Sequence, residues 1–239
     1  MIFRHKTNKH INTLSLKMNG LSISQVEKFT FLGLTINETL TLKDHIEIIS
    51  NRISKTIGIL SRLKHTLSPK ILKMIYTSLI LPRLHYCNLA WGFKPGRIEI
   101  LQKKAIRIIS NSKYNAHTDP LFKEMSLQKV ADIHVTAKLK FFYKLQNNML
   151  PPYFWQYMFT ANKSSTRSKD PVQNLVSRTK VFSETIRFSL PILLNNTPPL
   201  IKSKAYTHTL NGFIQYAKKY QLASYETDCK KQGCYICNR

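Results

Sequence analysis

Residues able to carry out catalysis are sparse in this chain. Twelve of its 239 residues are acidic, and the two closest in sequence, Glu226 and Asp228, lie near the C-terminus. A two-metal active site needs several carboxylates that converge on ions roughly 4 Å apart. No phosphate-binding glycine loop and no glycine pattern around a serine nucleophile is present either. We therefore expect no catalytic residues, and we expect that this chain alone is not an enzyme.

Three cysteines near the C-terminus have a spacing that suits a metal ion. Cys229, Cys234 and Cys237 form a C-x4-C-x2-C pattern, and a structural zinc ion takes four ligands of this kind. His208 is the nearest upstream candidate for the fourth ligand. The alternative is a reduced tail without metal, because four cysteines and no signal peptide favour a reducing compartment. Zinc is the only cofactor that the chain's own residues suggest.

The charge of the chain indicates its class of partner. Lys and Arg number 37 against 12 acidic residues, which gives a net charge of +25. Such an excess favours a polyanionic partner, either nucleic acid or an anionic membrane. No charge-poor run reaches the roughly 18 apolar residues of a spanning helix, and the N-terminus lacks the apolar core of a signal peptide. We expect RNA or DNA as partner, no membrane, and an intracellular location in nucleus or cytoplasm.

The elements that must position these charges centre on residues 29–67. Residues 29–37 suit a strand, and Gly33 inside it indicates a bulge or a close approach of another backbone. Thr41 and Asp44 match a capping box at the start of a helix. One helical stripe follows, made of Ile46, Ile49, Ile53, Ile57, Leu60, Leu63 and Leu67.

Two helical faces carry the candidate phosphate contacts. Glu47 lies on the first of them, and a small residue between two cations there would let a phosphate backbone approach. The alternative is a solvated face with a tolerated glycine. The same alternative applies to a second helix, expected over residues 97–110 with Ile98, Leu101, Ala105 and Ile108 facing the core. The candidate nucleic-acid contacts on the two faces are Asn51, Lys55, Gly58, Arg62, Lys103, Lys104 and Arg107.

The remaining chain predicts a mainly α fold with a small N-terminal antiparallel sheet and an irregular C-terminal part. Asn19-Gly20 predicts a hairpin turn, and Ser68-Pro69 predicts a helix start. Ser126 is expected to cap a helix that runs to about residue 148, with His134 as a core histidine. The aromatic residues of 153–159 are expected to pack on that helix rather than stack on bases. Residues 186–194 suggest a strand, and residues 210–217 a last helix.

Composition divides the chain into four expected parts. Residues 1–37 form the strands and 38–160 a helical bundle. Residues 161–185, rich in Ser, Thr and Lys, form a basic flexible loop. Residues 186–239 form a C-terminal extension that ends in the cysteine tail.

Several strings in a fixed order resemble a known family. They are FLGLTI (31–36), TLKDHI (41–46), ISKTIGIL (53–60), YTSLILPRLHYC (76–87) with WG (91–92), LQKKAIRII (101–109) and AHTDPLF (116–122). In this order they resemble the segment after the palm in reverse transcriptases of jockey-like non-LTR retrotransposons. The resemblance covers about residues 1–160 and continues loosely to about 222.

The resemblance implies a role in holding nucleic acid. The strand with Phe31, Leu32 and Gly33 resembles the primer grip, which holds the growing 3′ end, and the following helices resemble the thumb, which tracks the template-primer duplex. The family's catalytic aspartates, its magnesium ions, the fingers and the endonuclease would lie upstream. Met1 would then be an internal methionine of a longer frame, and the missing fingers and palm would be partners.

The leading hypothesis is a polymerase fragment that binds template-primer without the catalytic palm. The alternatives are an independent basic helical protein that binds RNA or DNA, and a decayed transposon-derived frame without function. Genomic sequence upstream of Met1 separates the three. Fingers and palm motifs there favour the first, unrelated sequence the second, and stop codons the third.

Overall fold

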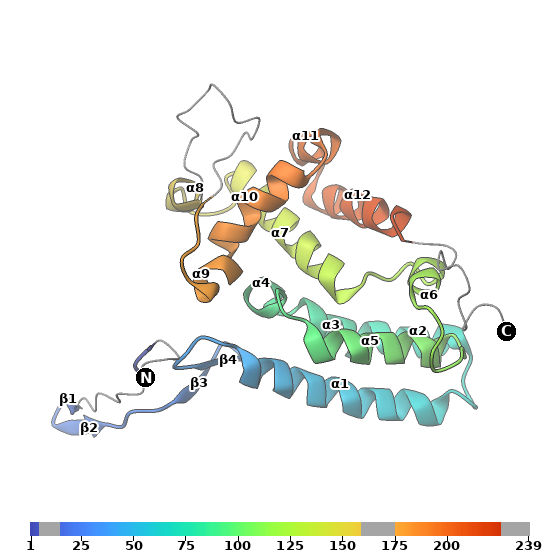
Figure 1. The fold of residues 1–239 in the computed structure, drawn as a ribbon, viewed down its shortest axis with the longest axis horizontal. Helices are drawn as coiled ribbons and strands as arrows, with labels where there is room; N and C mark the ends of the chain where they lie inside the picture. Colours follow the sequence, from blue (N-terminus) through green and yellow to red (C-terminus); the bar gives the residue numbers. More distant parts are fainter. Residues whose placement is uncertain (5–14, 159–174, 226–239) are drawn as a thin grey trace.

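The described chain is mainly helical, with its strands confined to the N-terminal part, as the sequence predicted (Figure 1). The structure is a computed structural model that describes residues 1–4, 15–158 and 175–225. In Figure 1 the first helix lies along one side of the molecule, a middle layer of helices covers it, and the C-terminal helices lie on the opposite side.

Two β-hairpins replace the three predicted strands. The Asn19-Gly20 turn joins the first pair, as expected, and the second pair lies in a separate sheet. Each hairpin is antiparallel. Their strands are β1 (Leu16–Met18), β2 (Leu21–Ile23), β3 (Lys28–Phe31) and β4 (Leu34–Asn37).

The prediction of one strand interrupted by a bulge at Gly33 is wrong. Phe31 pairs with Leu34 across β3 and β4, so Leu32 and Gly33 form a two-residue loop. Both have positive φ, 45° and 76°, which is the pattern of a type I′ hairpin turn. The glycine therefore reverses the chain direction, which an alternation pattern alone did not reveal.

The predicted capping box is also wrong. Helix α1 (Lys43–Leu63) begins after Leu42, which has a φ of 53°, and no side chain caps its first turn. The Asn37 amide of β4 donates instead to Thr41 Oγ1 and to Asp44 Oδ2, both at 2.8 Å. These two contacts tie the hairpin to the start of the helix.

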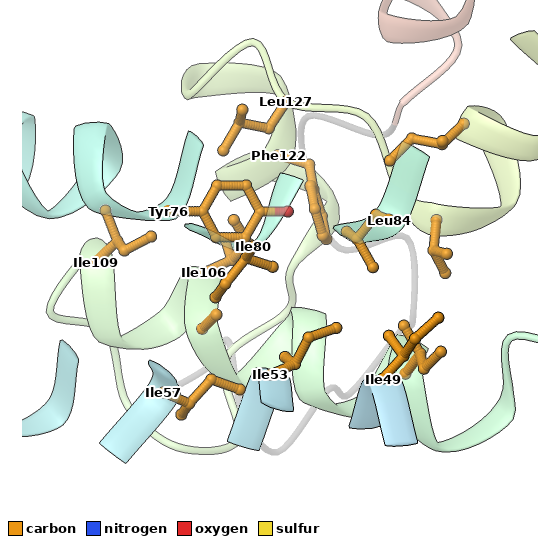
Figure 2. Packing of buried hydrophobic residues seen from close by; sticks show 14 of the residues in the cluster. Ile49, Ile53, Ile57, Tyr76, Ile80, Leu84, Ile106, Ile109, Phe122 and Leu127 are labelled. Atoms are coloured by element: carbon orange, nitrogen blue, oxygen red, sulfur yellow. The ribbon is translucent and has the colours of Figure 1, made fainter. Parts of the chain in front are cut away.

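Helix α1 buries the stripe that its sequence predicts. Ile53 and Leu60 are fully buried, and Ile46, Leu63 and Leu67 pack at the edge of the same core. Figure 2 shows Ile49, Ile53 and Ile57 of this helix pointing toward Ile106, Ile109, Tyr76 and Ile80. Burial of this stripe fixes the rotation of α1 about its own axis.

Four helices cover α1. Ser68 precedes α2, with Pro69 in its first turn as predicted. The helical conformation is interrupted at Ile80, two residues before Pro82, so that α2 and α3 are separate helices. The helices are α2 (Pro69–Leu79), α3 (Leu81–His85), α4 (Asn88–Trp91) and α5 (Gly96–Ile109).

Helix α5 is buried on a wider face than predicted. Ile98 and Ala105 are buried as expected, but Ile106 and Ile109 are more buried than Leu101 and Ile108. The reason is that α5 contacts α1 on one side and α2 and α7 on others. A helix with neighbours on several sides buries more than one stripe.

Helix α6 (Asp119–Glu124) leads to α7 (Val130–Gln146), which starts later than predicted. Ser126 has a φ of 52° and lies before the helix rather than capping it. His134 is a core histidine, as expected, with 7% of its surface exposed. Leu139 and Leu145 of α7 belong to a second core cluster, whereas Val130 and Ile133 belong to the first.

The second core cluster is formed largely by residues of the C-terminal helices. The prediction of a strand over residues 186–194 is wrong. This stretch is helical and contains the buried Pro191. Leu190 and Leu194, four residues apart, are both buried against α7 and its neighbours, and this packing outweighs the weak local preference. The C-terminal part is therefore more regular than predicted. Its helices are α8 (Tyr153–Met158), α9 (Lys180–Glu184), α10 (Ile186–Asn196), α11 (Pro199–Thr207) and α12 (Leu210–Ala223).

The aromatic segment after α7 packs on that helix only in part, because Tyr153, Trp155 and Tyr157 are exposed. Phe154 of α8 contacts Phe141 of α7 edge-on, with ring centroids 6.3 Å apart. Helix α9 falls within residues 161–185, which were expected to be a basic flexible loop; residues 161–174 of that range lie outside the described residues. The last helix, expected over 210–217, is found as α12.

Candidate nucleic-acid interface

Helices α1 and α5 pack side by side (Figure 1), and residues of both helices line a groove. Its narrow end has a volume of about 330 Å³. It is lined by Ser54, Ile57, Gly58, Ser61, Arg62, Leu101 and Lys104. We call this region, together with the hollow that continues it, the α1–α5 groove.

The groove widens toward the end of α5 into a hollow of about 460 Å³. Ser61 and Lys104 line both parts, so the two are adjacent. The wide end also reaches the loop after α5. We call this part the Tyr114 hollow; its lining residues are Ser61, Lys64, Ile100, Lys104, Arg107, Ile108, Asn111, Ser112 and Tyr114.

The groove is positively charged. Four cations line it, and none of the described residues lining it is acidic. Arg62, Lys64 and Lys104 form no ion pair with any described residue. A concave surface with one sign of charge concentrates the opposite ion, so the groove is the candidate site for phosphate groups.

Gly58 has no packing role in the described structure. A Cβ built on it meets no heavy atom within 4 Å. Glycine inside a helix costs roughly 0.5–1 kcal/mol relative to alanine. The glycine faces the groove beside Arg62, where the absence of a side chain lets a ligand backbone approach α1.

Arg107 contributes both charge and structure. Its Nε donates to the carbonyl of Ala116 at 2.8 Å, and its own carbonyl accepts from the amide of Ser112 at 3.0 Å. Partial burial lowers the pKa of this guanidinium from its usual value, although an arginine stays charged at neutral pH. Arg107 therefore holds the loop that follows α5 and faces the hollow at the same time.

The structure brings together part of the predicted contact set. Gly58, Arg62, Lys104 and Arg107 all line the groove. Lys103 is not among the lining residues, and its amine donates to Glu99 at 2.6 Å on the same helix.

Asn51 and Lys55 do not line the groove; Lys55 extends its positive charge along α1, and Asn51 adds a neutral amide. They lie seven and three residues before Gly58, so helical spacing puts them on the same face of the helix. Both are exposed. A ligand longer than the groove would pass over them.

Phe31, Leu32 and Gly33 lie at a different place. They form the exposed end of the β3–β4 hairpin, with 75% of Leu32 exposed. The Tyr86 hydroxyl donates to the Leu32 carbonyl, and a Cβ on Gly33 would lie 3.3 Å from the Tyr86 ring. None of these residues lines the groove.

Ser61, Lys64 and Tyr114 also line the groove, although they were not predicted from the sequence. Ser61 and Lys64 follow Ser54, Ile57 and Gly58 at helical spacing, and that spacing was an available signal. Tyr114 lies in an irregular loop, where no periodicity shows which way a side chain points.

A metal site is not found among the described residues: no three His, Cys, Asp or Glu side chains are grouped to hold an ion there. The predicted zinc ligands Cys229, Cys234 and Cys237 lie outside these residues, and His208 has Thr207 Oγ1 near its Nδ1 at 2.9 Å. In the same described ranges, every helix falls short of the length and hydropathy needed to cross a bilayer.

Sequence comparison relates half of the chain to polymerases of mobile elements. The chain is 24% identical over 127 residues to the "Probable RNA-directed DNA polymerase from transposon BS" of Drosophila melanogaster, which is 50% of this chain and 14% of that protein. It is 27% identical over 124 residues to the "RNA-directed DNA polymerase from mobile element jockey" of D. melanogaster, which is 49% of this chain and 14% of that protein. The protein of the same name from D. funebris is also 27% identical over 124 residues, which is 48% of this chain and 13% of that protein. No family model and no solved structure matches.

These matches confirm the resemblance to jockey-like reverse transcriptases. The matched part of the chain spans about one seventh of the length of these relatives.

Proposed function

We propose that this chain, related over half its length to RNA-directed DNA polymerases, is a template-primer binding part of such an enzyme. Nucleic acid binds in the α1–α5 groove, where Arg62, Lys64, Lys104 and Arg107 neutralise phosphates. The chain positions nucleic acid and performs no chemistry alone. Magnesium and the catalytic carboxylates belong to the fingers and palm of the parent polymerase, which would be its protein partners.

One observation carries the proposal. Four cations and a helix glycine without a packing role meet in a single groove that no acidic side chain lines among the described residues. An exposed helix face that served only solvation would not need Gly58, since alanine would fit there and stabilise the helix.

The hairpin end provides a second contact in this proposal. Phe31 and Leu32 are exposed at the β3–β4 turn, and we assign them and Gly33 to the primer strand, as the family resemblance implies. The groove and the hairpin end would then hold one duplex at two points.

The test is binding of the purified chain to a template-primer duplex at several salt concentrations. Neutralising about four phosphates predicts a loss of affinity on the order of 10²-fold between 50 and 200 mM salt. We expect Arg62→Ala and Lys104→Ala each to reduce the slope of log affinity against log salt by about 1.

The matched control is Lys219→Ala. Lys219 is an exposed lysine of α12, away from the lining residues of the groove. Binding that follows net charge alone predicts equal losses for Lys104→Ala and Lys219→Ala, and that result would contradict the assignment of the groove.

A further inference from the structure

Tyr114 is the most exposed aromatic residue of the groove, and phosphate binding does not explain it. Its side chain is 89% exposed, and it borders the same hollow as Lys104 and Arg107. An aromatic ring left in water next to cations favours a ligand that has both a flat apolar face and negative charge.

The loop that carries Tyr114 is held on both sides of it. The amide of Ser112 donates to the Arg107 carbonyl, and the Ala116 carbonyl accepts from Arg107 Nε. The amide of Ala116 also donates to the Lys113 carbonyl at 3.0 Å. The ring therefore projects from an ordered turn, which reduces the entropy that a ligand must pay on binding.

The wall of the hollow offers apolar contacts for a nucleobase beside the cations that suit a phosphate. Ile100 is 69% exposed and Ile108 also lines the hollow. Asn111 adds an amide that both donates and accepts hydrogen bonds. A hollow of about 460 Å³ is in the size range of a small-ligand site, and its wall combines the apolar side chains of Ile100 and Ile108 with the three cations.

We propose that the Tyr114 hollow binds an unpaired nucleotide, so that the α1–α5 groove takes single-stranded RNA or DNA at its wide end. The base lies against Tyr114 and Ile100, while Lys64, Lys104 and Arg107 hold the adjoining phosphates. A base inside a duplex is covered by its neighbours and cannot reach this ring, whereas an overhang can. This inference rests on the proposed function of the groove and adds the strand type that it recognises.

The experiment compares a duplex that has a four-nucleotide overhang with a blunt duplex of equal phosphate number. Tyr114→Ala should weaken overhang binding by about 5- to 100-fold, the contribution of one base–aromatic stack, and leave blunt binding unchanged. Tyr114→Phe keeps the ring and should bind as the parent chain does. Tyr206→Ala, at an exposed tyrosine of α11, is the matched control and should have no effect.

An abasic overhang isolates the base itself. Removing the bases keeps the phosphates, so the parent chain should lose as much affinity as Tyr114→Ala loses, and the variant should lose nothing more. Overhangs of RNA and of DNA are measured in parallel, and loss with either supports the inference. The inference is overturned if Tyr114→Ala binds both overhangs as tightly as the parent chain while Lys104→Ala weakens binding. If Lys104→Ala and Arg62→Ala also have no effect, the proposed function fails with it.

Discussion

At the scale of single residues, two glycines in helical surroundings have opposite reasons for being there. Gly58 is free of neighbours, whereas a Cβ on Gly92 would lie 2.6 Å from Nδ1 of His134 and closer still to the side chain of Asn88. Packing therefore explains the second glycine but not the first, for which we propose that a ligand is the reason. Substitution by alanine separates these roles.

Gly58→Ala should raise stability and weaken nucleic-acid binding. Alanine restores helix propensity at an open position, so the free energy of unfolding should rise by about 0.5–1 kcal/mol. The added methyl group narrows the α1–α5 groove, so affinity for template-primer should fall. Urea denaturation and binding titration measure the two effects; unchanged affinity in the stabilised variant would remove Gly58 from the interface.

Gly92→Ala should destabilise the fold. The methyl group would collide with the pair formed by Asn88 and His134, in which the Asn88 Oδ1 lies 3.0 Å from His134 Nδ1. Overpacking of this kind costs about 1–3 kcal/mol. Thermal unfolding measures it, with Gly58→Ala as the control; equal melting temperatures for the two variants would show that α4 and α7 adjust without cost.

At the scale of elements, the β3–β4 hairpin is attached to the helices by few contacts. Thr35 donates its amide to His45 Nδ1 at 3.3 Å, and Tyr86 holds the turn through the Leu32 carbonyl. Asn37 joins β4 to the start of α1. The position of the hairpin end therefore depends strongly on the conformation of the turn.

Gly33→Val should loosen the hairpin even without nucleic acid. A β-branched residue at a φ of 76° is strained by about 1–3 kcal/mol, and its Cβ would press on Tyr86. We expect a lower melting temperature and weaker binding of blunt and recessed ends alike. Gly33→Asn tolerates positive φ better and serves as the control; a valine variant with normal melting and selective loss at primer ends would favour direct primer contact by this glycine.

At the scale of the whole molecule, the folded chain combines a high positive charge with buried neutral histidines. Burial lowers the pKa of His134 to about 4, with a further contribution from the charge of Lys138. Burial also lowers the pKa of His45, aided by Arg52.

The Nε2 atoms of both histidines are buried without a hydrogen-bond partner among the described residues. A second proton on His134 would go to Nε2 and be an unpaired charge, because its Nδ1 faces two oxygens of Asn88. A second proton on His45 would go to Nδ1 and face the amide of Thr35.

Stability should fall as the pH is lowered from about 6.5 to about 4. In this window the unfolded chain binds protons on these histidines, since their ordinary pKa is 6.5, whereas folded His134 stays neutral. Proton uptake therefore favours the unfolded state, and the effect levels off below pH 4. Urea denaturation across this range measures it, and His134→Gln should flatten the slope; a variant slope equal to that of the parent chain would assign the effect elsewhere.

Local signals in the sequence determined much of this protein. The α1 stripe, the Ser68-Pro69 start of α2 and the excess of basic residues follow from residue types and spacing, because helical periodicity and charge are local properties. The order of the short sequence strings also indicated a resemblance to jockey-like reverse transcriptases, which sequence comparison confirmed over half the chain. Helical periodicity and charge were sufficient to select four of the residues that line the groove, Gly58, Arg62, Lys104 and Arg107.

Tertiary structure alone decided the rest. Residues 186–194 read as a strand locally and form a helix because Leu190 and Leu194 have α7 to pack against. Lys103 and Lys104 are neighbours in sequence, yet only Lys104 faces the groove, since the packing of α5 against α1 fixes its rotation. Tyr114 lies at the site because backbone hydrogen bonds hold the loop that carries it. Such bonds join residues without any periodic pattern, and so no pattern in the sequence predicts them.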